Sequence, residues 1–312
     1  MTTKSLTRAL LGCAALFAAL APNTQAAAQD AARKVVIGLS QPNLEHPYRV
    51  GGTARAKEWA KAHPNVELVV IDGRRDSAVQ LASIEDLMSR RVDVLVMSPN
   101  DSNALGPVAD AVKRAKVPLI VFDRKLNTQG DAVAAFIGAD NVEMGRVAAR
   151  FLADKIGGKG TVIQVEGTPG ASATIERKQG FEQEMAKHPG VKVVSYVGHY
   201  RMHDAATVME DAIVAHRDVA AVYAHNDSMA LGAAQVLGER GKSSVPVVGM
   251  DGAKEGCDGI KAGTLAGSVY YPTMFPEALD VAMNVLDGKA VEKSVMLDTP
   301  IITTANAAQF CN

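Results

Sequence analysis

The sequence predicts an α/β fold made of two similar lobes, each built on a parallel sheet, because two strand patterns occur twice. Residues 92–101 and 219–227 are both apolar strands that end in Asn-Asp, and residues 117–123 and 245–251 both begin with Val-Pro and end in Asp. Ligands bind at the carboxyl ends of the strands in open α/β sheets. Two lobes that each present polar strand ends therefore predict a ligand-binding cleft between them.

Apolar runs alternate with helical patterns along most of the chain, as is typical of parallel β-α-β units with right-handed crossovers. The first run is followed by the loop QPNLEHPYR rather than by G-x-G-x-x-G, which argues against a dinucleotide site. In the first lobe we expect strands at 33–40, 66–71, 92–97, 117–122 and 133–138, and helices at 52–63, at 77–90 with Ser77 as N-cap, and before 117. In the second lobe we expect strands at 161–165, 192–197, 219–224, 245–250 and 265–270, and helices at 141–155, 172–188, 204–216, up to 240, and at 254–262.

Three crossings between the lobes are expected. The strand at 133–138 has no long helix before it, so the first crossing follows it, a second lies at 271–272, and a third near Pro300. The helix at 275–286 then belongs to the first lobe. The predicted organisation is a removed signal peptide at 1–28, an N-terminal lobe of 33–138 plus 272–300, and a C-terminal lobe of 139–271 plus 301–312, joined by a three-strand hinge.

Composition limits the possible partners. The chain has 312 residues, enough for two lobes, and 47% of them are hydrophobic, which supports sizeable cores. The formal net charge of −1 gives no electrostatic reason to expect nucleic acid or an anionic membrane surface as a partner.

The N-terminus has the pattern of a secretory signal peptide. Lys4 and Arg8 precede the apolar run 9–21, and Ala26 and Ala28 follow with the spacing of a cleavage site. The alternative is a lipoprotein signal that ends at Cys13, but only three apolar residues of the run precede its glycine. Export predicts an oxidising compartment, in which the remaining Cys257 and Cys311 form a disulfide or stay as two free thiols.

The polar residues expected at strand ends and in the adjoining loops suit a polyhydroxylated ligand. Carboxylates accept from hydroxyl groups, guanidinium groups donate in forks, and aromatic faces pack on the apolar face of a sugar ring. Taken one at a time, each residue also has a purely structural explanation, such as a surface ion pair or a solvated helix side chain. The candidate ligand-binding residues are Glu45, Tyr48, Arg49, Asp123, Arg124, Arg177, Tyr200, Asn226, Asp251 and Tyr271.

Signals for an enzyme are weak. The sequence has neither a G-x-S-x-G elbow nor a Walker loop. His199 and His203 have i, i+4 spacing without the glutamate that a zinc helix needs, and Cys257 has no partners that would make it a nucleophile. We therefore expect no catalytic residues, no cofactor and no metal.

In combination, several motifs resemble one known family, the type I periplasmic sugar-binding proteins of ABC importers. They are the predicted signal peptide, the duplicated Rossmann-like lobes, FDR at 122–124, GTPGAS at 167–172 with Arg177, AHNDSMALGA at 224–233 and VGMDG at 248–252. The resemblance covers essentially the whole mature chain. It is strongest to the ribose-binding and galactofuranose-binding proteins.

The resemblance implies roles for single positions. The ligand pair Asp-Arg of the family falls on Asp123 and Arg124, and its other ligand residues fall on Arg177, Asn226 and Asp251. Ribose binders have two adjacent phenylalanines where this chain has Tyr48 and Arg49, a glutamine at Tyr271 and a stacking phenylalanine at Tyr200. Glu45 with the aromatic-Arg pair resembles the galactofuranose binders instead, which favours a furanose-like or other small sugar over ribose.

The implied function is that of a monomeric periplasmic receptor that closes on a monosaccharide, such as galactofuranose or a pentose or hexose, and delivers it to the permease of an ABC importer. A periplasmic sensor that presents its sugar to a chemoreceptor or sensor kinase is the alternative. A sugar-responsive repressor would need a helix-turn-helix where this chain has a signal peptide. An enzyme would chemically change its sugar.

Overall fold

The computed structural model describes residues 34–129 and 131–311, so the predicted signal peptide and Cys13 lie outside the described residues. The first sheet has six strands in the order β11-β5-β4-β3-β1-β2, and its described pairs are all parallel. Its strands are β1 (Val35–Gln41), β2 (Val66–Asp72), β3 (Val94–Met97), β4 (Leu119–Phe122), β5 (Val133–Gly138) and β11 (Ser294–Met296).

The second sheet repeats the same plan in the order β12-β10-β9-β8-β6-β7. Its strands are β6 (Lys159–Glu166), β7 (Gly190–Val197), β8 (Val219–Ala224), β9 (Val247–Asp251), β10 (Gly267–Tyr270) and β12 (Ile301–Ile302). Among the described strand pairs, only β10 with β12 is antiparallel. The predicted α/β fold with two parallel-dominated sheets is confirmed.

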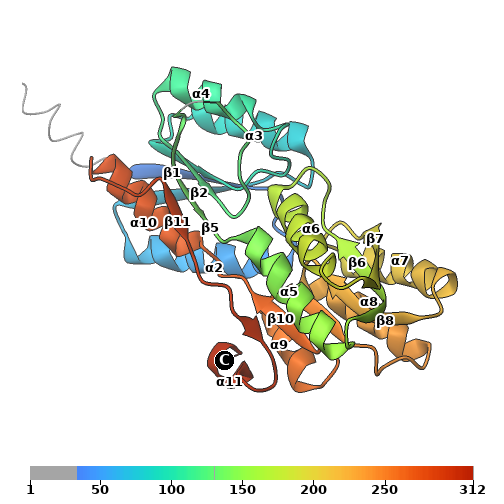
Figure 1. Ribbon diagram of the computed structural model, residues 1–312. Helices are drawn as coiled ribbons and strands as arrows, with labels where there is room; N and C mark the ends of the chain where they lie inside the picture. The colour runs from blue at the N-terminus through green and yellow to red at the C-terminus, as the bar shows by residue number, and fades with distance from the viewer. Residues whose placement is uncertain (1–33, 130, 312) are drawn as a thin grey trace, which may run out of the picture. The chain divides into compact units, whose positions relative to one another are not determined.

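Helices cover both faces of each sheet (Figure 1). Around the first sheet lie α2 (Pro47–Ala62), α3 (Ser77–Ser89), α4 (Pro107–Ala115) and α10 (Phe275–Leu286), and around the second lie α5 (Asn141–Lys155), α6 (Ser172–Met185), α7 (Met202–Ala215), α8 (Asp227–Glu239), α9 (Lys254–Lys261) and α11 (Ala307–Phe310). Strands β3 and β4 are buried along their whole length, as expected for parallel strands covered on both faces. No helix in the described part of the chain is both long and apolar enough to cross a membrane.

Alternation along the strands directs successive side chains to opposite faces. In β4, Ile120 and Phe122 pack in the core beneath α2 and α10, whereas Leu119 and Val121 pack against α3 and α4. Each sheet is therefore a central layer with a core on each side, and its polar groups gather at the strand ends.

Within the described residues the chain passes between the two sheets three times. It leaves the first sheet after β5, returns to it after β10, and leaves it again between β11 and β12, through residues 139–140, 271–274 and 297–300. Both sheets belong to one compact unit, Val35–Asn312. We call the part built on the first sheet the N-half and the part built on the second the C-half. The placing of domain boundaries at these segments stays a prediction.

Two local expectations were wrong. The helix expected to begin at residue 52 begins at Pro47, because a proline without an N–H group suits the first helical position. Tyr48 and Arg49 therefore lie in the first turn of α2 and not in a loop. The N-cap of α3 is Asp76 rather than Ser77, since the Asp76 carboxylate accepts from the backbone N–H groups of Ala78 and Val79.

Two glycines let α5 and α6 approach closely. A Cβ atom added to Gly180 would collide with the backbone oxygen of Val142, and one added to Gly145 would collide with the backbone oxygen of Arg177. Without side chains at these positions the helix backbones pack directly against each other. This packing fixes the turn of α6 that carries Arg177.

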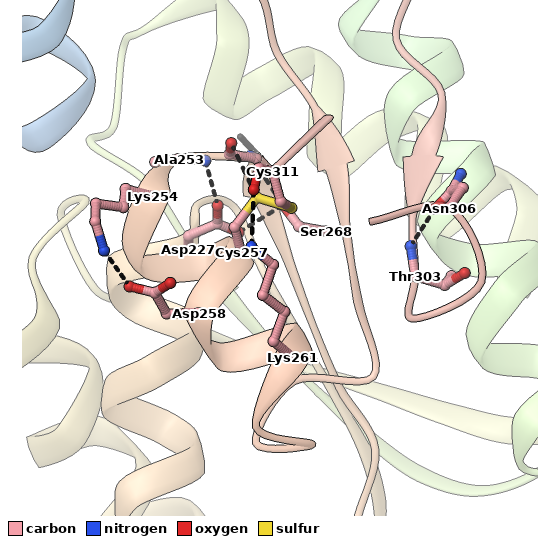
Figure 2. Close-up of a disulfide and its surroundings, with 11 residues drawn as sticks. Asp227, Ala253, Lys254, Cys257, Asp258, Lys261, Ser268, Thr303, Asn306 and Cys311 are labelled. Atoms are coloured by element: carbon pink, nitrogen blue, oxygen red, sulfur yellow. Dashed lines mark hydrogen bonds and ion pairs between the residues drawn. A yellow bond between two sulfur atoms is a disulfide. The ribbon is translucent and has the colours of Figure 1, made fainter. Parts of the chain in front are cut away.

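A disulfide joins Cys257 in α9 to Cys311 after α11 (Figure 2), as the first of the two sequence alternatives predicted. The two cysteines are 54 residues apart in the sequence. The Lys261 ammonium donates to the backbone oxygen of Cys311 at 2.7 Å, and both cysteines are buried. The bond therefore ties the C-terminal segment to the helix that follows β9.

Removing this bond should lower the stability of the protein without affecting its ligand site directly. In the chain-entropy model a loop of this size stabilises by about 4 kcal/mol, and measured values for native disulfides are about 2–5 kcal/mol. We expect the double variant Cys257→Ser/Cys311→Ser to lose about 2–4 kcal/mol in its free energy of unfolding, measured by urea titration. Superimposable urea curves for the two proteins would contradict this expectation.

Candidate ligand-binding site

The carboxyl ends of strands from both sheets converge on one small cavity. Its volume is about 30 Å³, room for about one water molecule. Side chains from the N-half and the C-half face each other across it. The lining residues are Asn43, His46, Tyr48, Arg49, Arg75, Asp123, Arg124, Ala173, Arg177, Tyr200, Asn226, Asp251 and Tyr271.

Asp123 is the centre of the N-half side. It follows β4 directly, and its φ of 63° turns the chain sharply where the strand ends. Its carboxylate accepts from the Arg49 guanidinium, from the Ser98 hydroxyl at 2.6 Å and from the Tyr271 hydroxyl at 2.9 Å. Burial alone would raise the pKa of Asp123, but Arg49 and Arg124 outweigh it and hold the pKa at about 2. Asp123 is therefore a fixed anion at neutral pH.

Arg177 has the corresponding position on the C-half side. Its Nε donates to Asn141 Oδ1 at 2.8 Å, and its Nη1 donates to the backbone oxygen of His225. The guanidinium carbon lies 4.7 Å from the ring centroid of Tyr271, in cation–π contact. Burial opposes its charge, but Tyr200, Tyr271 and Asp251 together raise the pKa of Arg177 further above its usual value. The side chain is thus a permanently charged donor held from three sides.

Asp251 offers an acceptor that the protein itself does not use. It ends β9, is 8% exposed, and its carboxylate makes no hydrogen bond or ion pair within the described residues. Burial, opposed by the Arg177 guanidinium and reinforced by Glu255, raises the pKa of the Asp251 carboxyl to about 7. A buried carboxyl without a partner is costly unless a ligand donates to it.

Aromatic faces complete the cavity wall. The Tyr48 and Tyr271 rings lie 5.5 Å apart at 39°, and the Tyr48 hydroxyl donates to the backbone oxygens of Pro272 and Thr273 at 3.1 Å. The Tyr200 hydroxyl shares a hydrogen bond of 2.9 Å with Thr174, and the Arg124 guanidinium lies 5.4 Å from the Tyr200 ring. Because these hydroxyl groups already have partners, the rings are held in place and present their apolar faces.

Four of the residues that line this cavity have strained backbone. Arg75, Asp123, Tyr200 and Asp251 have φ angles of 60°, 63°, 60° and 119°, a region that residues with a Cβ rarely adopt. Such conformations cost about 1–3 kcal/mol each and cluster at functional sites. Their occurrence on both halves of the cavity supports its assignment as a functional site.

Nine of the ten residues predicted from the sequence line this one cavity, and the exception is Glu45. Glu45 is exposed and forms an ion pair with Arg75, which does line the cavity. Asp227, which the sequence placed beside Asn226 at the same strand end, also points elsewhere. Its carboxylate accepts from the Ser268 hydroxyl at 2.6 Å and from the Ala253 N–H at 3.0 Å (Figure 2).

Four lining residues were not predicted, namely Asn43, His46, Arg75 and Ala173. Asn43 and Arg75 follow β1 and β2, so the rule about strand ends, applied to every strand, would have found them. His46 lies in the predicted loop, but its importance comes from a contact with Asn226, 180 residues away in the sequence. Nothing in the local pattern signals that contact.

The groups that line the site suit the binding of a polar ligand. It offers guanidinium donors, carboxylate acceptors and aromatic faces, the groups that recognise several hydroxyls at once. Within the described residues, no cluster of three or more His, Cys, Asp or Glu side chains could hold a metal ion. The arrangement is suited to holding a polar ring.

The family profile described as a periplasmic binding protein domain matches residues 37–290. The chain belongs to the type I periplasmic sugar-binding proteins. It is 36% identical to the ribose import binding protein RbsB of Salmonella typhimurium over 296 residues. This match covers 94% of this chain and 96% of that protein. It is 29% identical to the galactofuranose-binding protein YtfQ of Escherichia coli, over 67% of this chain and 68% of that one.

Solved structures of the same family share the fold of this sugar-binding protein. A protein from Mycobacterium smegmatis in complex with β-D-fucofuranose superimposes with a TM-score of 0.84 and 30% identity, over 88% of this chain and 93% of that chain. The family consists of binding proteins rather than enzymes, in agreement with the sequence-based expectation that this protein is not an enzyme.

Proposed function

We propose that this protein captures one monosaccharide in the cavity between its halves and delivers it to the membrane permease of an ABC importer. It would act as a monomer in the periplasm after loss of its signal peptide. The observation that carries the proposal is the convergence of Asp123, Arg177 and Asp251 from opposite halves on one cavity that tyrosine rings also line. Charged hydrogen bonds contribute about 1.5–3 kcal/mol each. Several of them would hold and select a small sugar.

A furanose-like ring is the sugar form we favour, with a pentose or hexose as the wider class. Supporting it are the Tyr48–Arg49 pair in α2 and the relatives that bind galactofuranose and β-D-fucofuranose. In such a site, a sugar that lacks one hydroxyl would leave a buried partner without its hydrogen bond. The proposed ligand residues are the nine predicted residues that line the cavity, without Glu45.

Entry of the sugar requires the halves to separate, because a cavity of about 30 Å³ is several times smaller than a monosaccharide. The three segments 139–140, 271–274 and 297–300 would serve as the hinge. A sugar that contacts both halves favours the closed state by the difference between its affinities for the closed and the open state.

Thermal unfolding in the presence of single sugars tests this proposal. Binding stabilises by RT ln(1 + [L]/Kd), about 2.7 kcal/mol when the sugar is at 100 times its Kd. We expect at least one member of a panel of D-ribose, L-arabinose, D-fructose and D-galactose to raise the Tm by several degrees. A panel without any effect would count against a monosaccharide ligand.

Deletion of the gene should stop uptake of the active sugar. Loss of sensing with intact uptake would instead favour the alternative, a periplasmic sensor.

A further inference from the structure

His46 makes a direct polar contact between the two halves. It lies immediately before α2 on the N-half, and its Nε2 is 2.6 Å from the side-chain nitrogen of Asn226 on the C-half. The imidazole is half-buried, and its backbone N–H donates to Asn43 Oδ1. This contact forms only when the two halves lie together.

The other bonds of Asn226 decide which atom donates. Asn226 is the N-cap of α8, and its Oδ1 accepts from the backbone N–H of Met229 at 2.9 Å. Since the oxygen is used there, the amide nitrogen faces His46 and donates. The imidazole Nε2 must accept, which requires neutral His46 with its proton on Nδ1. A protonated imidazole would place two donors against each other.

The charges around His46 also favour the neutral form. Burial, followed by Arg49, Arg75 and Arg124, lowers the pKa of His46 to about 3, and Asp123 opposes them only in part. His46 also stands at the positive end of the α2 dipole. From the C-half, the titratable groups that line the same cavity are Arg177, Tyr200 and Asp251, and Asn226 adds an uncharged donor.

We propose that His46 is a positioning residue whose neutral imidazole holds the halves together through Asn226, so that closure on a sugar excludes a proton from this side chain. The inference rests on the proposed function and adds a pH dependence to it. At low pH the open form keeps the proton on His46, and closure must release it. Sugar affinity therefore falls as the medium becomes acidic.

The direction and size of the effect follow from linkage. The pKa of His46 is lower in the closed form than in the open form of the protein. The contact between His46 and Asn226 therefore contributes fully to sugar affinity when the pH is above the pKa of His46 in the open form, and it contributes less as the pH falls below that value. If His46 has the ordinary histidine pKa of about 6.5 in the open form, sugar affinity falls about 30-fold between pH 7.5 and 5.0. Arg49, Arg75 and Arg124 lie on the same half as His46 and act on the open form too. If these arginines lower the pKa of His46 in the open form to about 5.5, sugar affinity falls about 4-fold over the same pH range.

The test compares the wild-type protein with His46→Gln. Glutamine can accept from Asn226 but does not titrate. The dissociation constant of the most stabilising sugar of the panel is measured by calorimetry at pH 7.5 and 5.0 for both proteins. We expect affinity to fall 4- to 30-fold more in the wild type than in His46→Gln. His63→Gln, at the other end of α2, is the matched control and should keep the wild-type profile.

Two outcomes separate the inference from the function on which it rests. Equal pH dependence in the wild type and His46→Gln would overturn the role of His46 while leaving sugar binding intact. No binding by the wild type at either pH would overturn the proposed function and this inference with it. If His46→Gln does not fold, NMR titration of the wild-type imidazole decides. The titration midpoint of the His46 imidazole should move below pH 5 when the sugar is added. A midpoint that does not change would contradict the proposal.

Discussion

Replacing Asp123 with alanine should lower sugar affinity by at least about 100-fold. The substitution removes an ionised acceptor on the N-half side of the cavity and leaves the buried Arg49 without its carboxylate partner. Losing charged hydrogen bonds worth about 1.5–3 kcal/mol each, together with the cost of an unpaired buried charge, accounts for this size. Calorimetric titration with the most stabilising sugar of the panel measures it.

Asp123→Asn is the matched variant because it keeps the shape and one acceptor oxygen while removing the charge. Its affinity should lie between those of the wild type and Asp123→Ala. The side chains of Ser98 and Tyr271 also contact the carboxylate, so the retained oxygen has partners available. If Asp123→Ala bound the sugar within threefold of the wild type, Asp123 would not be a ligand residue and the assigned cavity would be wrong.

Arg177→Ala is the second substitution with a large expected effect, again a loss of affinity of about 100-fold or more. Arg177 supplies the charged donor on the C-half side, and its bonds to Asn141 and the His225 carbonyl aim it into the cavity. Its removal would also leave the Asp251 carboxyl without the cation that opposes the rise in its pKa. The same calorimetric titration, made at pH 7.5, measures the loss.

Two further variants show whether the loss of affinity in Arg177→Ala comes from the guanidinium group itself or from a disturbed helix. Arg177→Lys keeps the charge but not the planar fork, so it should recover only part of the affinity. Lys178→Ala, next in the sequence, removes a partly exposed ion pair with Glu166 and should leave affinity unchanged. Equal losses in Arg177→Ala and Lys178→Ala would indicate a general disturbance of α6 and contradict a direct role for Arg177.

The strand ends were predictable because topology, rather than detailed packing, brings them together. Parallel sheets place the carboxyl ends of neighbouring strands at one edge, so Asp123 and Asp251 could be assigned before their surroundings were known. Arg177 is different, because helical spacing alone cannot tell a cavity residue from a solvated one. The sequence placed it among the candidates, the family resemblance supported that assignment, and the close packing that Gly145 and Gly180 allow puts the side chain in place.

What the sequence could not decide was the direction of neighbouring side chains and the partners of distant ones. Asn226 and Asp227 are adjacent, yet the extended backbone of the N-cap directs the first to the cavity, while the second packs toward Ser268. Glu45 was expected in the cavity, but Arg75 from another strand end holds it outside. These outcomes depend on contacts between segments far apart in the sequence, which no local pattern records.

The most direct test of the account is calorimetric titration of the mature wild-type protein with each sugar of the panel at pH 7.5. The account predicts that at least one sugar binds saturably with one site per chain and micromolar or tighter affinity, about −8 kcal/mol or better. Absence of saturable binding by every sugar, or binding at more than one site per chain, would contradict a single cavity closed between the two halves.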